Sequence, residues 1–188
     1  MLRRFTSVLF EFLETVLTSV FILVAVYVFI AFPVMVQGRS MEPNLHTGDR
    51  LLVETITSKL FGYQRGEIVV LSAHVSGVAG LANELLVKRV IGLPGDRIKI
   101  YNCKVHIFKD GEIFEVAEGE YLPQGVCTIG GRAIEDGRPY TIPEGQYLVL
   151  GDNREYSSDS RVIGFVKSEN IQGKVVFLFF PFDKIKLY

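Results

Sequence analysis

Residues 85–101 read LLVKRVIGLPGDRIKIY and contain the pattern that decides the fold. Two short apolar runs, Leu85–Ile91 and Arg97–Tyr101, flank the sequence Leu93-Pro94-Gly95-Asp96. Proline and glycine together are typical of a tight turn, because proline presets its own backbone angle and glycine tolerates left-handed ones. The stretch therefore predicts two strands joined by a tight turn.

Further short apolar segments between turn signals extend this pattern over most of the remaining chain. Asp110-Gly111 separates two of them and favours a type I′ hairpin turn, while Ser72–Asn83 is rich in small residues and predicts a loop. No helical periodicity is sustained outside the N-terminal region, so we expect a mainly antiparallel β-sheet domain. The other expected strands are Leu51–Ile56, Glu67–Leu71, Val105–Phe108, Ile113–Val116, Tyr147–Leu150 and Lys174–Phe180.

The N-terminal region contains a long apolar run. No charged residue occurs from Thr15 to Gly38, and these 24 residues exceed the ~20 that a helix needs to cross a bilayer. We expect a cytoplasmic N-terminus at 1–14, a transmembrane anchor helix at 15–37 and an extracytoplasmic β domain at 38–188. A cleavable secretory signal is the competing interpretation, but its apolar core is only about 7–15 residues long and ends in small residues. A buried core helix is another alternative, and it would normally have a polar face.

Charge and composition narrow the possible partners. Arg3 and Arg4 precede the apolar run, which favours a cytoplasmic N-terminus. With 20 basic and 21 acidic residues the chain has no nucleic-acid footprint, and we expect no nucleic-acid partner. Its three histidines are scattered without metal-ligand spacing, so we expect neither a metal nor a cofactor. Cys103 and Cys127 could form a disulfide in an exported domain, or stay two unpaired thiols.

Ser40 and Lys88 are the candidates for chemistry. A serine hydroxyl attacks an amide only when a base removes its proton, and no His–Asp pattern lies near Ser40. A lysine can be that base if burial in an apolar setting lowers its pKa. Lys88 shares a face of its predicted strand with Leu86 and Val90, while Arg89 points the other way. Taken singly, a surface lysine on an edge strand and a serine in a turn are the commoner interpretations.

A polar block from Gly151 to Arg161 follows the apolar strand that ends at Leu150. It is dense in hydrogen-bonding groups, and Asp159 and Arg161 could form a charge pair. Such a density between two apolar segments indicates a network supporting a site, with a solvated loop as the alternative.

Together these blocks closely resemble type I signal peptidase, the membrane-bound serine protease family that removes signal peptides from exported bacterial proteins. The matching motifs occur in the family's order, behind the expected anchor, whereas residues 101–140 lie outside them and look like an insertion. The motifs are Ser40-Met41-Glu42-Pro43 with Leu45, Gly48-Asp49, Arg65 to Val70, Lys88 to Asp96, and Gly151 to Gly164.

The resemblance implies a role for each matching position. Ser40 would be the nucleophile, with its backbone N–H in the oxyanion hole, and Lys88 the general base. Ser157 would hydrogen-bond the lysine amine, and Asp159, Arg161 and Arg89 would support the site. Some family members have a Ser or Thr hydroxyl two positions before the nucleophile as a second oxyanion donor. This chain has Gly38 there, which leaves that donor unassigned.

The resemblance also implies the substrate and the location. Preproteins with signal peptides would be cut after small residues in an Ala-x-Ala-like pattern, by a single-pass enzyme of the bacterial plasma membrane whose catalytic domain is extracytoplasmic. Lipid bilayer would be the other partner. The expected apolar walls of the substrate pocket are Val36, Met41, Leu45, Leu86 and Val87.

Two other functions stay open at this point. A self-cleaving Ser–Lys repressor-type peptidase shares a β catalytic fold, but such proteins regulate DNA-binding domains and have no anchor. A membrane-tethered β module without catalysis would lack Ser40 or Lys88, and both are present. The run Phe177–Phe182 is ambiguous as well, because it suits a buried terminal strand or a face that enters lipid.

Overall fold

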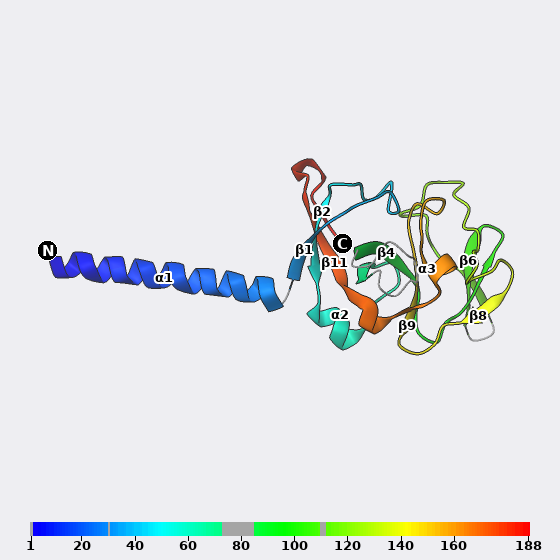
Figure 1. Cartoon of the computed structure of the whole chain (residues 1–188), viewed down its shortest axis with the longest axis horizontal. Coiled ribbons are helices and arrows are strands. Elements are labelled where there is room, and N and C mark those ends of the chain that lie inside the picture. The colour runs from blue at the N-terminus through cyan, green and yellow to red at the C-terminus, as the bar shows by residue number, and fades with distance from the viewer. Residues whose placement is uncertain (1, 30, 73–84, 110–111) are drawn as a thin grey trace.

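A computed structural model describes residues 2–29, 31–72, 85–109 and 112–188. Helix α1 (Leu2–Phe29) extends away from a β domain that contains the remaining elements (Figure 1). The expected loop at Ser72–Asn83 and the turn at Asp110-Gly111 lie almost entirely outside the described residues.

A large sheet of eight strands forms the body of the domain. Its order is β1-β2-β11-β3-β4-β9-β10, with β12 paired to β11, and every described pair is antiparallel. The strands are β1 (Ala31–Met35), β2 (Arg50–Glu54), β3 (Ile68–Ser72), β4 (Leu85–Gly92), β9 (Gln146–Leu150), β10 (Val166–Lys167), β11 (Ile171–Phe180) and β12 (Lys186–Leu187).

A second, four-stranded sheet is built by the insertion and the strand before it. Its order is β7-β6-β5-β8, again antiparallel. Asn102 and Cys103 form the two-residue connection between β5 and β6, and both have positive φ, at 51° and 64°, as a type I′ hairpin requires. The strands are β5 (Arg97–Tyr101), β6 (Lys104–Lys109), β7 (Glu112–Glu115) and β8 (Pro139–Thr141).

The disulfide between Cys103 and Cys127 closes this second sheet. It joins the β5–β6 turn to the long connection between β7 and β8, across 24 positions of sequence. Of the two possibilities left open by the sequence, the structure therefore has the bonded one.

The expectation of a mainly antiparallel β domain is confirmed, and most strands lie within a few residues of their predicted bounds. Short helices were not expected. In particular, Ile56 begins a helix where the sequence predicted the end of a strand. These helices are α2 (Ile56–Phe61) and α3 (Ser160–Ile163), with the 3₁₀ turns η2 (Ser168–Asn170) and η3 (Phe182–Lys184).

Three apolar clusters form the core. One joins β1, β2, β3 and β11 to the loop around Met41 and Leu45, and a second lies between β4, β9 and the small sheet. The third packs Leu86 and Val90 of β4 against β3, β9 and β11. The C-terminal apolar run is partly in the core and partly exposed, because Leu178 is buried whereas Phe182 is 76% exposed.

The expected membrane-spanning helix at 15–37 needs correction. Helix α1 ends at Phe29, and residues 31–35 form β1, so the uncharged run is shared between a helix and a strand. Pro33 is tolerated in β1 because this strand lies at the edge of the sheet. The helical part of the run, residues 15–29, rises only ~22 Å against the ~30 Å of a hydrocarbon core. Within the described ranges, no helix combines the length and the apolar character needed to cross a membrane.

Candidate active site

Ser40 and Lys88, 48 positions apart in the chain, meet in the structure. The Nζ of Lys88 lies 2.7 Å from the Oγ of Ser40, and it also donates a 3.1 Å hydrogen bond to the Val87 carbonyl. Lys88 stands in the middle of β4, whereas Ser40 lies in the loop between β1 and β2. The two side chains are therefore within direct proton-transfer distance.

Two buried side chains, Met41 and Leu45, anchor the loop around Ser40 in the core. Met41 and Leu45 are 1% and 0% exposed, and the Leu45 N–H donates to the Met41 carbonyl at 2.9 Å. On the other side the Asn153 N–H donates to the Ser40 carbonyl at 3.0 Å. These contacts fix the backbone of Ser40 while its side chain faces the lysine.

Burial makes the Lys88 amine easier to deprotonate. Its side chain is 2% exposed, and loss of hydration lowers the pKa of its amine from an ordinary 10.5 to about 8. Asp159 and Asp152 oppose this shift, and the positive charge of Arg161 adds to it. With a pKa of about 8, roughly a tenth of the amine is neutral at pH 7, far more than for an ordinary lysine.

The backbone before Ser40 explains why glycine occupies position 38. Gly38 has φ +87°, a conformation that L side chains rarely adopt, although a Cβ there would have open space around it. A Ser or Thr at this position would therefore be strained. Among the described residues the Ser40 N–H has no hydrogen-bond partner, which leaves it free to receive an oxyanion.

The polar block from Gly151 to Arg161 wraps around the buried Asp159. Arg161 Nε and Nη2 donate to the two oxygens of Asp159 at 2.8 and 2.9 Å. The Gly151 N–H donates to Asp159 Oδ2 at 3.0 Å. Asp159 also caps α3. The expected pair is thus present and joins both ends of the block.

Ser157 does not make the hydrogen bond that the sequence predicted. Its Oγ is buried and has no hydrogen-bond partner among the described residues, while the amine of Lys88 contacts Ser40 and Val87. The hydroxyl instead packs over Gly151, where an added Cβ would collide with it and with the Ser40 carbonyl.

Arg89 forms a buried ion pair that the sequence did not reveal. Its Nε and Nη2 donate to the two oxygens of Asp152 at 2.8 and 2.6 Å, and its guanidinium lies 4.1 Å from the centre of the Tyr121 ring. Asn44 completes the cluster with bonds to Asp152 Oδ2 and the Tyr121 carbonyl. Asp152 directly follows Gly151 in the polar block, which was the only available signal.

The residues expected to line the substrate pocket lie mostly in the core. Four of them belong to the first apolar cluster and are at most 7% exposed, whereas Leu86 packs against the third cluster. Leu86 is separated from the other four because it and Val87 lie on opposite faces of β4. The four are Val36, Met41, Leu45 and Val87.

Comparison with known proteins places the chain in a family. The family model described as signal peptidase, peptidase S26, matches residues 9–180. Signal peptidase IB of Staphylococcus aureus strain Mu50 is 35% identical over 185 residues, covering 95% of this chain and 93% of that protein. Signal peptidase I of Bacillus licheniformis is 34% identical over 182 residues, covering 95% and 92%.

A solved structure is also similar in sequence. It is a signal peptidase I from Enterococcus faecalis V583, which shares 27% identity and gives a TM-score of 0.43, over 60% of this chain and 95% of that one. At this TM-score the superposition adds nothing to the assignment, which the sequence matches alone support. The chain belongs to the S26 signal peptidases and is a type I signal peptidase, a serine endopeptidase that removes signal peptides.

Proposed function

We propose that the enzyme cleaves by acyl transfer, with Ser40 as nucleophile and Lys88 as general base. The observation that supports this most directly is the 2.7 Å contact between the Ser40 hydroxyl and a lysine amine that is almost fully buried. A serine next to an amine whose pKa is about 8 has the partner that its activation requires.

In the first half of the reaction the neutral Lys88 amine accepts the Ser40 proton, and Oγ attacks the scissile carbonyl carbon. The Ser40 N–H donates to the developing oxyanion, and a single donor of this kind can contribute about 3 kcal/mol. The protonated amine then gives its proton to the departing nitrogen. The C–N bond breaks and an acyl ester remains on Ser40.

In the second half a water molecule gives a proton to the now neutral amine and attacks the ester carbonyl. Collapse of that intermediate returns the proton to Ser40 Oγ and releases the carboxylate product. The pair Asp159 and Arg161 supports Lys88 by fixing the charges around it, and Arg89 does so by holding Asp152. Ser157 lies beside the site and is proposed only as a packing contact.

The proposed substrates are preproteins cut after small residues in an Ala-x-Ala-like pattern, as the motif resemblance implies. An extended peptide could pair with β1, because this strand lies at the edge of the large sheet and leads directly into the Ser40 loop. Adding a strand to an exposed edge is a common way to bind extended peptides.

The dyad is tested by substitution in the purified full-length chain, assayed in detergent on a preprotein with an Ala-x-Ala site. Ser40→Ala and Lys88→Ala should each lower kcat by about 10⁴-fold or more, the scale seen when a nucleophile or base is lost. Ser168→Ala and Lys167→Ala, both at exposed positions outside the polar block, are matched controls and should stay active. A Lys88→Ala enzyme with more than a tenth of normal kcat would exclude the dyad, and an unmodified chain that does not cleave the preprotein would indicate a non-catalytic module.

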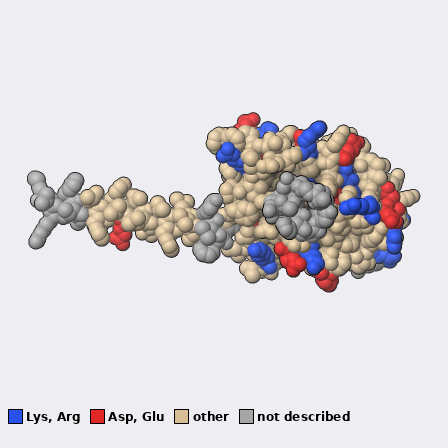
Figure 2. All heavy atoms as spheres, viewed as in Figure 1, with Lys and Arg blue, Asp and Glu red and all other residues tan. Residues whose placement is uncertain are grey.

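The structure also favours action at a lipid surface. Along α1 large apolar side chains are exposed, among them Phe10 at 69% and Phe21 at 73%, and the coloured part of this helix in Figure 2 shows little charge. In the β domain, Phe61 of α2 and Phe182 of η3 are also exposed, at 86% and 76%. Such apolar surface is unfavourable in water and typical of membrane contact. The side of the membrane occupied by the domain stays a prediction from Arg3 and Arg4.

Co-sedimentation with lipid vesicles tests this association. The full-length chain should pellet with vesicles, and a chain lacking residues 1–29 should lose most of this binding because the apolar area of α1 is gone. A second truncated chain with Phe182→Ser measures the contribution of η3. Equal partitioning of full-length and truncated chains would contradict a role for α1.

A further inference from the structure

A buried ion pair joins the insertion to the polar block from Gly151 to Arg161, which is called the catalytic block below. Arg154 lies within that block, and its guanidinium pairs with Glu118 from the connection between β7 and β8. Both side chains are almost fully buried, at 0% and 3% exposed. Tyr121 donates a 3.0 Å hydrogen bond to the same carboxylate, and Thr128 Oγ1 accepts from Arg154 Nη1.

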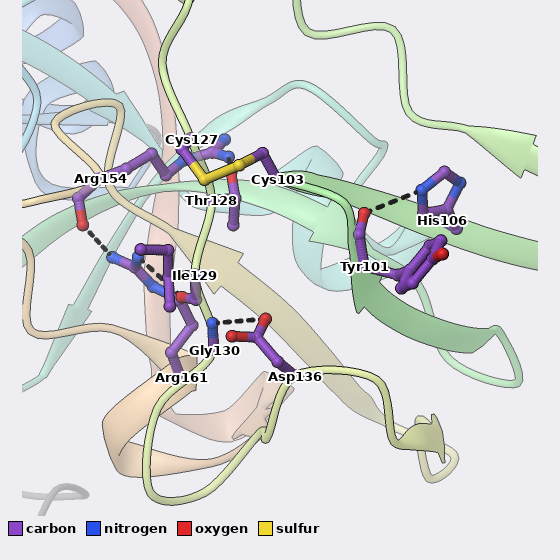
Figure 3. The surroundings of a disulfide bond; sticks show 10 residues. All are labelled: Tyr101, Cys103, His106, Cys127, Thr128, Ile129, Gly130, Asp136, Arg154 and Arg161. Atoms are coloured by element: carbon purple, nitrogen blue, oxygen red, sulfur yellow. Dashed lines mark hydrogen bonds between the residues drawn. A yellow bond between two sulfur atoms is a disulfide. The ribbon is translucent and has the colours of Figure 1, made fainter.

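Arg154 is in turn bonded to the residues that hold the proposed dyad. Its Nε donates to the Gly151 carbonyl at 3.0 Å, and its own carbonyl accepts from Arg161 Nη2 at 2.7 Å (Figure 3). The neighbouring Asn153 holds the Ser40 carbonyl. Arg154 thus bonds Glu118 and the Gly151 carbonyl through its guanidinium, and Arg161 of the Asp159–Arg161 pair through its own backbone carbonyl. The next residue along the backbone, Asn153, makes the bond to the nucleophile's carbonyl.

The insertion side of this cluster is itself firmly placed. Thr128 directly follows Cys127 of the disulfide, and its N–H donates to the Cys103 carbonyl at 2.9 Å. Figure 3 shows Arg154 lying against Cys127 and Thr128, with Arg161 bonded to the Ile129 carbonyl from the other direction. The connection between β7 and β8 therefore packs against the catalytic block and bonds to Arg154 and Arg161 within it.

We propose that Glu118 is a positioning residue of the active site, acting through Arg154 to hold the loop that fixes Ser40 and Asp159. The proposal rests on the dyad proposed above and assigns the insertion a part in that site. A buried guanidinium needs a paired carboxylate, since an unpaired buried charge is strongly unfavourable. Without Glu118 the Arg154 side chain would turn toward water, and the backbone groups it bonds would move with it.

The central test compares Glu118→Gln with Glu120→Gln in the full-length enzyme. Glu120 is exposed and lies two positions away, so it is the matched control. Glu118→Gln should lower kcat by roughly 10- to 100-fold, the effect of displacing catalytic groups by about 1 Å. KM should change by less than about threefold, because substrate-binding edges are untouched. Glu118→Asp, which keeps the charge, should recover most of the lost kcat.

A double-variant comparison establishes the route of the effect. If Glu118 acts through Arg154, then Arg154→Met with Glu118→Gln should be no slower than Arg154→Met alone. Losses in kcat that multiply would overturn this route. Equal kcat for Glu118→Gln and Glu120→Gln would overturn the proposal itself.

Two further variants, Thr128→Val and Lys88→Ala, test the proposal if Glu118→Gln does not fold and separate it from the dyad hypothesis. Should Glu118→Gln fail to fold, as judged by circular dichroism, Thr128→Val keeps the ion pair and removes one bond to Arg154. We expect it to lower kcat by roughly 2- to 10-fold, and an unchanged kcat would count against the proposal. Lys88→Ala in the same assay separates the two hypotheses, since activity there refutes the dyad whatever Glu118→Gln shows.

Discussion

The two sheets of this enzyme differ in burial and in what they contribute to the candidate active site. In the large sheet β4 is buried from Val87 to Gly92, and this burial lowers the pKa of Lys88, the proposed base. In the small sheet all four residues of β7 are exposed, including Ile113 and Phe114 at 61% and 50%. One face of the small sheet packs on the second apolar cluster, a disulfide links its β5–β6 turn to the β7–β8 connection, and that connection supplies Glu118 to the ion pair with Arg154. Recognisable motifs concentrate in the large sheet, whereas the contribution of the small sheet comes from a single side chain without a motif.

Among the changes that test this difference between the sheets, Gly151→Ala should have the largest effect on activity, because Gly151 lies where the large sheet meets the catalytic block. A Cβ there would collide with the side chain of Ser157 and the carbonyl of Ser40. Gly151→Ala should therefore lower kcat/KM by about 100-fold or more through displacement of the nucleophile, and destabilise the fold by about 1–3 kcal/mol. Gly119→Ala, in open space within the insertion, is the control. Equal activity of the two variants would show that the block tolerates movement.

The next effect is the pH dependence that burial in the large sheet imposes. The base must be neutral, and burial lowers the pKa of Lys88 to about 8, so protonation on acidification removes the active form. We expect kcat/KM to fall about tenfold per pH unit below that pKa and to level off above it. The measurement is kcat/KM between pH 6 and 9.5, with circular dichroism to establish that the fold persists. A profile that is flat from pH 6 to 8 would be inconsistent with Lys88 as the base.

The smallest effect on catalysis is expected at the disulfide of the small sheet. Replacing Cys103 and Cys127 together by serine frees a loop of 24 positions and should cost about 3 kcal/mol of unfolding free energy. Because Glu118 and Arg154 still pair, kcat should fall by less than about threefold. Denaturant titration and steady-state assays test both parts. A loss of kcat as large as that of Glu118→Gln would mean that the disulfide, and not the ion pair, positions the block.

Local pattern predicted much of this molecule. The strand at Arg97–Tyr101 has the predicted bounds, and β4 differs by one residue, because turn chemistry and apolar runs are local signals. The helix boundary at Phe29 was not predicted, since hydropathy cannot separate an apolar helix from the apolar edge strand that follows it. The pocket walls stay a prediction, because apolar residues near a nucleophile can belong to the core, as four of these five do here.

Sequence by itself determined the family, since the motifs around Ser40, around Lys88 and in the polar block occur in the order of the type I signal peptidases. It also determined the β class of the fold, through turns and short apolar runs. Only the tertiary structure decided which groups meet: Lys88 with Ser40, Arg89 with Asp152, and Glu118 with Arg154. Those meetings depend on pairing between strands and loops distant in the chain, and on burial that changes a pKa or makes an ion pair indispensable. Neither the pairing of distant segments nor the burial of a side chain can be read from a local stretch of sequence.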